Sequence, residues 1–182
     1  MSRFYTQTGD DGYTGLIGEG RAEKYDRRIE TIGAVDEANA VLGLVRANCL
    51  TAKTASIVLA IQKDLYHMMA EIAATPENAA QFRTISSARV EWLEMQIDEI
   101  SIEVNIPDGF IVPGDSKTGA FIDLARAIVR RAERQIAFLL HQKLVENRQI
   151  LRYLNRLSSL CFALELLENQ AAGKAQPTFA RE

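Results

Sequence analysis

The chain has 182 residues, 47% hydrophobic and 25% charged, which is ordinary for one globular domain with a sizeable core. Its formal net charge of −3 argues against a non-specific nucleic-acid binder, which needs a basic surface. The two cysteines and two histidines are too few and too scattered to favour a zinc site or a Ser-His-Asp triad. No segment has the apolar character of a signal peptide or a membrane span, which predicts a cytoplasmic protein without membrane contact.

Residues 1–25 are rich in glycine. Five of the eleven glycines lie within the first twenty residues, between threonines and aspartates. A regular helix is disfavoured there, because each glycine costs about 1 kcal/mol relative to alanine. Free backbone N–H groups and hydroxyls are typical of an anion-binding loop, although a flexible N-terminal arm has the same composition. Lys24 ends the segment, either as part of such a site or as a solvated lysine.

The rest of the chain predicts an all-α protein. Apolar residues recur at three- and four-residue steps in five segments, and no segment reads as a strand. We therefore predict a five-helix bundle over residues 26–168 within one domain of residues 1–182. A tail over residues 169–182, rich in Ala, Gly, Gln and Pro, is expected to be loosely ordered. The predicted helices cover about 26–45, 52–73, 87–100, 117–141 and 148–168.

The first predicted helix carries a stripe of small residues interrupted by Asp36. Small residues allow another helix to approach closely, and a carboxylate among them requires a cationic partner because an unpaired buried carboxylate is costly. An arginine of the fourth helix could supply that partner, either within the chain or from a neighbouring chain.

The loop between the third and fourth helices holds three apolar residues, 110–112, among two prolines and two glycines. Such residues must pack on something. Phe110 either covers the core as a lid or contacts the apolar face of a ligand.

The fourth helix carries four arginines in nine residues, at positions 126, 130, 131 and 134, with Glu133 among them. On a helix, Asp123, Arg126, Arg130 and Glu133 share one side, opposite the apolar face. Arginine forks suit phosphate or carboxylate, although a solvated face of Arg–Glu pairs has the same spacing.

Several separated segments together resemble the ATP:cob(I)alamin adenosyltransferases of the propanediol-utilisation type. The resemblance is collinear over nearly the whole chain, and its two C-terminal segments are the most specific. Two positions depart from the family pattern, both on the expected corrinoid side: Asp115, where a second glycine is common, and Asp123, where a histidine is common. The segments that carry the resemblance are residues 5–14, 24, 33–37, 110–114, 126–134 and 151–158.

This resemblance implies a homotrimer with active sites between subunits. Asp36 of one subunit would pair with Arg126 of the next, and Phe110 would face the corrin and help to expel its lower axial ligand. Mg²⁺ would be held through the ATP phosphates rather than by protein side chains. The ATP site would comprise Thr6, Thr8, Gly9, Thr14, Gly15 and Lys24, completed by Arg130, Glu133, Arg134 and Asn155.

The implied reaction moves the 5′-deoxyadenosyl group of ATP to the cobalt of a reduced corrinoid, with Arg130 and Phe110 as catalytic residues. A cobalamin reductase and an adenosylcobalamin-dependent enzyme are the expected partners. Two alternatives stay open at the level of sequence. One is an ATP-binding sensor or carrier that has lost corrinoid turnover, and the other is a structural bundle whose Arg–Glu stripe seals an oligomer.

Overall fold

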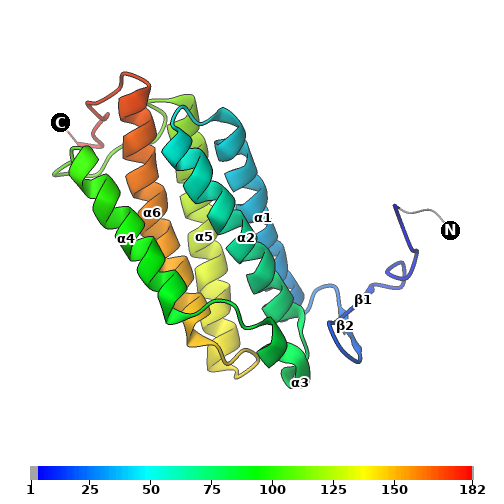
Figure 1. The fold of residues 1–182 in the computed structure, drawn as a ribbon. Helices are drawn as coiled ribbons and strands as arrows, with labels where there is room; N and C mark the ends of the chain where they lie inside the picture. The colour runs from blue at the N-terminus through cyan, green and yellow to red at the C-terminus, as the bar shows by residue number, and fades with distance from the viewer. Residues whose placement is uncertain (1–3, 182) are drawn as a thin grey trace.

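The computed structural model describes residues 4–181, so the first three residues of the segment 1–25 and Glu182 of the tail lie outside it. Long helices run side by side, with a small β-hairpin at one end of the bundle (Figure 1). The elements are β1 (Tyr13–Gly15), β2 (Arg21–Glu23), α1 (Arg27–Asn48), α2 (Ala52–Ala73), α3 (Pro76–Ala79), a 3₁₀ turn (Ala80–Phe82), α4 (Ser87–Glu103), α5 (Lys117–His141) and α6 (Arg148–Ala171).

Polar side chains define where the long helices begin. Asp26, Thr51, Ser116 and Asn147 each accept a hydrogen bond from a backbone N–H group in the first turn of α1, α2, α5 and α6. These are the side chains that satisfy the N–H groups left free at a helix start. Ser86 occupies the same position before α4, where its side chain makes no capping hydrogen bond.

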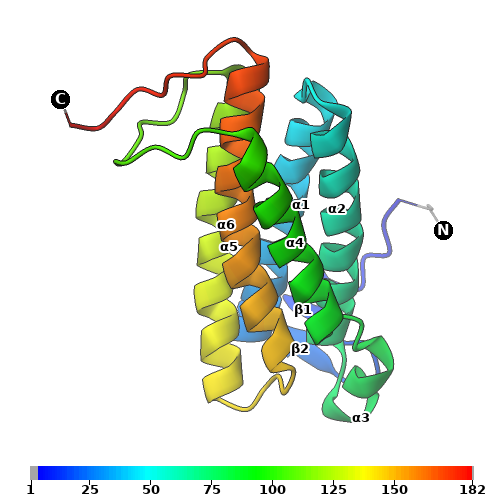
Figure 2. The same ribbon diagram turned by 60° about the vertical axis from the view of Figure 1, so that its left-hand side comes forward.

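Helix α5 lies at the centre of the packing. It packs against α1 and α6, α2 covers α1, and α4 covers the other side of α6 (Figure 2). The apolar face of α5, which includes Ile122, Val129 and Ile136, is fully buried in the core. The opposite face of α5, which carries the arginines, is therefore left at the surface, as the apolar periodicity predicts.

Two details of the all-α, five-helix prediction need correction. The described residues contain six α-helices, because Pro76, expected only to end α2, begins the short α3 at a position where its fixed φ suits a helix start. They also contain a two-stranded antiparallel sheet, in which Tyr13 pairs with Glu23 and Gly15 pairs with Arg21. The hairpin turn includes Gly18 and Gly20 at positive φ, which other residues adopt only with strain.

The C-terminal tail lies against the loop between α4 and α5, a contact that the sequence does not predict. Val112 N–H donates to Thr178 O at 2.8 Å, and Ala180 N–H donates to Phe110 O at 2.8 Å. The Asp115 carboxylate accepts from the Thr178 hydroxyl at 2.7 Å and from its N–H at 3.0 Å. The tail thus holds both ends of the segment 110–115. Across residues 4–181, no helix has the length and apolarity needed to cross a membrane.

Candidate functional site

A basic hollow of about 550 Å³ lies between the exposed faces of α5 and α6. Consecutive turns of α5 place Arg130, Glu133 and Arg134 on one side of it, and α6 supplies the other side. The hollow therefore brings four guanidinium groups toward one volume, an arrangement suited to an anion with several charges. Its lining is Arg130, Glu133, Arg134, Ala137, Leu151, Arg152, Asn155 and Arg156.

Hydrogen bonds fix the side chains of Glu133 and Asn155 in this hollow. Asn155 Nδ2 donates to Glu133 Oε1 at 2.8 Å, and Arg156 NH1 donates to Asn155 Oδ1 at 2.7 Å. Within residues 4–181, the guanidinium groups of Arg130 and Arg134 have no hydrogen-bond or ion-pair partner, and both residues are exposed. These two cations are available to a ligand, while Glu133 and Asn155 are already oriented.

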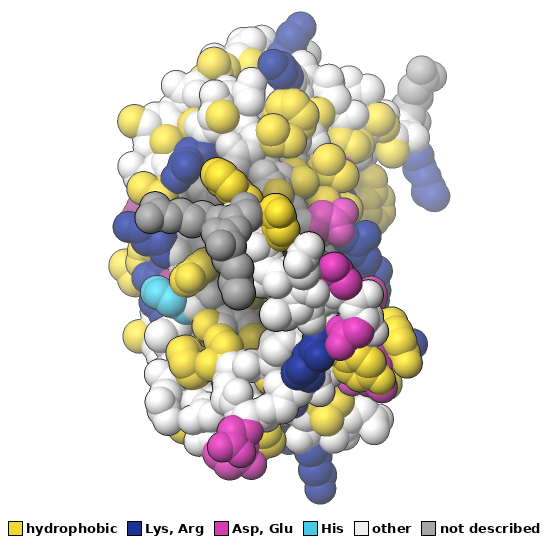
Figure 3. Space-filling model, turned by 90° about the vertical axis from the view of Figure 1, so that its right-hand side faces the viewer, with side chains coloured by type: hydrophobic (Ala, Val, Ile, Leu, Met, Phe, Trp, Pro, Cys, Tyr) yellow, Lys and Arg dark blue, Asp and Glu magenta, His cyan; other side chains and the backbone are white. Residues whose placement is uncertain are grey.

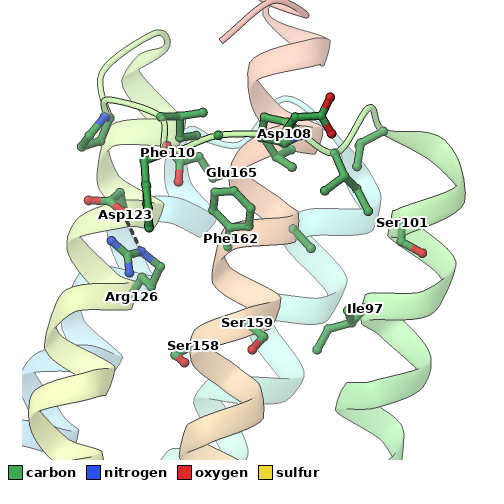
Figure 4. A pocket seen from close by; sticks show the side chains of 18 of the residues that line it. Ile97, Ser101, Asp108, Phe110, Asp123, Arg126, Ser158, Ser159, Phe162 and Glu165 are labelled. Carbon is green, nitrogen blue, oxygen red and sulfur yellow. Dashed lines mark hydrogen bonds and ion pairs between the residues drawn. The ribbon is translucent and has the colours of Figure 1, made fainter. Parts of the chain in front are cut away.

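A larger hollow of about 780 Å³ adjoins the first and has an apolar character. Its walls come from α4, α5 and α6, and the loop 106–113 closes one end (Figure 4). Phe110 lines it with 88% of its surface exposed, so it is not a lid on the hydrophobic core. Phe162 of α6 lies across from it in the same hollow. The apolar side chains of this volume suit a large, flat ligand.

One corner of the larger hollow is charged. Arg126 Nε donates to Asp123 Oδ1 at 2.7 Å, one turn apart on α5. Beside this pair lies Glu165, which is 1% exposed and whose Oε1 has no hydrogen-bond partner among the described residues. Burial, followed by the nearby Asp123 carboxylate, raises the pKa of Glu165 to about 7. A buried carboxyl in this state can exist protonated or ionised near neutral pH.

Arg130 lines both hollows. The basic volume and the apolar volume therefore meet at a single guanidinium group. A ligand with phosphates in the first and a ligand with an apolar face in the second would have their reacting ends near Arg130.

The N-terminal residues form a separate cluster around the hairpin. Arg21 NH1 and NH2 each donate to the Asp11 carboxylate at 2.8 Å, and Arg21 NH2 also donates to the backbone oxygens of Thr8 and Tyr13. The Thr6 and Thr8 hydroxyls lie 2.8 Å apart. Arg21 thus holds the glycine-rich loop in shape. The sequence analysis missed this role. The available signal was an arginine ten residues after an aspartate, with glycines between them.

Lys24 is close to this loop, since a Cβ added at Gly9 would lie 2.9 Å from its Nζ. The hairpin projects beside the ends of α1 and α2 (Figure 1), and none of its residues lines either hollow. Figure 3 looks onto this side of the molecule, where basic and acidic side chains lie side by side at the right-hand edge. The predicted ATP residues therefore form two groups, one on α5 and α6 and one at the N-terminus, which a single chain does not bring together.

The predicted partners Asp36 and Arg126 are not paired within the chain. Asp36 is exposed on α1, and Arg126 pairs with Asp123. The neighbouring residue Glu37 accepts a hydrogen bond from Arg131 NH2, which ties α1 to α5 beside the arginine face. Asp36 is left facing outward, where another chain could reach it.

Comparison with known proteins agrees with this geometry. The family model described as cobalamin adenosyltransferase matches residues 4–168. A corrinoid adenosyltransferase of Bacillus subtilis is 36% identical over 98% of this chain and 93% of its own length. The corrinoid adenosyltransferase PduO of Salmonella typhimurium is also 36% identical over 94% of this chain, which spans only 51% of that longer protein.

Solved structures give the same result. A phenylalanine-to-alanine variant of the PduO-type ATP:corrinoid adenosyltransferase from Lactobacillus reuteri, complexed with cobalamin and ATP, has a TM-score of 0.88 at 29% identity, covering 99% of this chain and all of that one. An arginine-to-lysine variant from the same organism, complexed with ATP, has a TM-score of 0.86, covering 97% and 99% of the two chains. The chain belongs to the cobalamin adenosyltransferase family.

Proposed function

We propose that the protein transfers the 5′-deoxyadenosyl group of ATP to the cobalt of a reduced corrinoid. The observation that carries this proposal is the position of Arg130, which lines both the basic and the apolar hollow. Transfer requires two ligands of very different character to meet at one point. The triphosphate fits the arginine-lined volume, and the corrin ring fits the apolar one.

In this reaction the electron pair of Co(I) attacks C5′ of ATP, the C5′–O bond breaks, and triphosphate leaves with the bonding pair. The cobalt becomes formally Co(III) and carries the new Co–C bond. Because Co(I) is already a strong nucleophile, no general base is required. The protein holds C5′ and cobalt in line and stabilises the charge on the leaving triphosphate. Arg130 and Arg134, whose guanidinium groups have no partner among residues 4–181, are suited to the second task.

On the nucleotide side, we assign Glu133 and Asn155 to orientation of ATP, because their mutual hydrogen bond fixes both side chains in the basic hollow. Residues 4–181 contain no cluster of three or more His, Cys, Asp or Glu side chains that could hold a metal. We further propose that Mg²⁺ is bound through the ATP phosphates, where it would neutralise part of their charge.

On the corrinoid side, we assign Phe110 to the face of the corrin. Its exposed ring at the end of the apolar hollow could exclude the lower axial ligand of Co(II), which makes the cobalt easier to reduce. A separate reductase would supply the electron, and an adenosylcobalamin-dependent enzyme would receive the product. We further propose that the reaction takes place in the cytoplasm, where ATP is abundant.

The N-terminal cluster leads us to propose a site shared between chains. Thr6, Thr8 and Lys24 line neither of the hollows that Arg130 lines, yet they have the character of a phosphate-binding loop, as do Gly9, Thr14 and Gly15. A neighbouring chain in a homotrimer of one-domain subunits would bring its N-terminal loop to the α5–α6 face. The outward-facing Asp36 could then pair with Arg126 across the boundary.

This pairing predicts the outcome of a charge reversal. The variants Asp36→Arg and Arg126→Asp should each lower the trimer fraction, and the double variant should recover part of it, with a coupling of about 0.5–3 kcal/mol. Sedimentation velocity of the three proteins gives the trimer fractions. Glu37→Arg serves as the matched control, since Glu37 pairs within the chain with Arg131 and should not be rescued by Arg126→Asp. Strictly additive losses would argue against a direct pair.

The function itself is tested by incubating the protein with ATP and chemically reduced cobalamin and measuring adenosylcobalamin and triphosphate. We expect equal amounts of both products. ATP binding without turnover would instead support the sensor or carrier, and absence of nucleotide binding would support a structural bundle.

A further inference from the structure

Glu165 is a buried acid that the reaction described above does not use. It lies on α6 with 1% of its surface exposed, and within residues 4–181 its Oε1 has no hydrogen-bond partner. The side chain lines the apolar hollow next to Asp123 and Arg126 (Figure 4). Buried polar atoms are almost always hydrogen-bonded, and leaving one without a partner costs free energy. A ligand that fills the hollow could provide the missing partner.

The surroundings of Glu165 are mainly acidic. Helix α5 presents Asp123 and Arg126, which pair with each other, and Arg130 lies one turn further along. The loop contributes Asp108 to the lining, and Asp115 acts on Glu165 through space. The α4 wall contributes Ile97 and Ser101, which carry no charge. Arg126 is thus engaged by Asp123. Burial, followed by the carboxylates of Asp123 and Asp115, raises the pKa of Glu165 to about 7 against the lowering effect of Arg126.

Corrinoids differ in the groups that surround the ring. Their peripheral side chains end in carboxamides or, in less processed forms, in carboxylic acids. A carboxamide can donate an N–H to an ionised Glu165 and can accept a hydrogen bond from the protonated form. A carboxylate has no hydrogen to donate and is repelled by ionised Glu165, and when it accepts from protonated Glu165 it still meets the like charge of Asp123.

We propose that Glu165 binds a peripheral carboxamide of the corrinoid and, together with Asp123, selects amidated corrinoids over those with free carboxylic acid side chains. This inference rests on the proposed adenosyl transfer and adds the substrate class at its corrinoid side. The selectivity comes from charge repulsion against a carboxylate side chain as well as from a hydrogen bond to a carboxamide.

The selection should depend on pH. Carboxylic acid side chains of a corrinoid stay ionised between pH 6 and pH 8, whereas Glu165 is mostly protonated at pH 6 and mostly ionised at pH 8. The preference for amides should therefore rise with pH in the wild-type protein. With glutamine at position 165, which has no charge to gain, the preference should be lower and independent of pH.

The test compares cobinamide, whose side chains are amides, with cobyrinic acid, whose side chains are carboxylic acids, both chemically reduced to Co(I). The wild-type ratio of kcat/KM for the two should increase by about tenfold between pH 6 and pH 8, as expected for a close like-charge contact. Glu165→Gln should abolish this increase and leave ATP binding unchanged. Glu91→Gln, an exposed acid on α4 outside both hollows, should behave as wild type.

Two results would overturn the inference while leaving adenosyl transfer intact: a wild-type ratio that does not change with pH, or a Glu165→Gln ratio that follows the wild type. The first needs no variant, so the test survives if Glu165→Gln fails to fold. Absence of any adenosylated product from both corrinoids would instead count against the proposed function.

Discussion

Replacing Phe110 with alanine should lower turnover that starts from Co(II) cobalamin by about a hundredfold, equivalent to about 2.7 kcal/mol in the barrier. The reason is that the ring is in position to exclude the lower axial ligand, and Co(II) that keeps this ligand is much harder to reduce. Stability should hardly change, because Phe110 is 88% exposed. A buried phenylalanine would cost about 3–5 kcal/mol on the same change.

Three measurements separate the effect on reduction from other effects. Chemically prepared Co(I) should restore much of the rate of Phe110→Ala, ATP affinity should match the wild type, and the melting temperature should stay close to it. Phe138→Ala is a matched control, since Phe138 is an exposed phenylalanine on α5 outside both hollows. A Phe110→Ala protein that melts early, or one that turns over Co(II) normally, would contradict the assignment.

The second large effect concerns Arg130. Changing it to alanine should weaken ATP binding or turnover by about ten- to a hundredfold, because a charge-assisted contact to phosphate is worth about 1.5–3 kcal/mol. The fold should be unaffected, since Arg130 is exposed and its guanidinium has no partner among residues 4–181. Isothermal titration with ATP measures the loss of binding, and the rate with Co(I) cobalamin measures the loss of turnover.

The matched control for Arg130→Ala is Arg148→Ala. Arg148 is an exposed arginine at the start of α6 and lines neither hollow. The Arg148→Ala protein should bind ATP with wild-type affinity. This result would separate the loss of a local phosphate contact from the effect of a general loss of positive charge. Wild-type affinity and rate in Arg130→Ala itself would remove this residue from the site.

The sequence was sufficient to predict the long helices and the arginine face. Apolar periodicity acts over one or two turns, so it is readable locally. The caps at Ser116 and Asn147 are findings of the structure. The hairpin was not predicted because its strands have three residues each, too few to show an alternating pattern, and the ion pair between Arg21 and Asp11 joins residues ten apart. The docking of the tail on the loop was missed for a similar reason, since Asp115 and Thr178 are 63 residues apart.

For the site, too, the sequence predicted what depends on one helix and missed what depends on the whole fold. Asp123 and Arg126 were placed on one stripe of a helix, and the structure pairs them at 2.7 Å. Glu165 was overlooked, because a single acid within the apolar α6 pattern looks like an ordinary break in periodicity. Only the fold shows that this position is fully buried against α5 and the loop. A carboxylate at an otherwise core-facing helical position was the available signal.

The most direct test of a site shared between chains is subunit complementation. The variants Lys24→Ala and Arg130→Ala should each be severely impaired. When they are co-expressed with two different tags and purified as mixed trimers, about one third of the sites should combine an intact N-terminal loop from one chain with an intact α5–α6 face from another. Recovery of adenosylcobalamin formation to about a third of the wild-type rate is the predicted result, and mixed trimers with no more activity than the two separate variants would contradict the account.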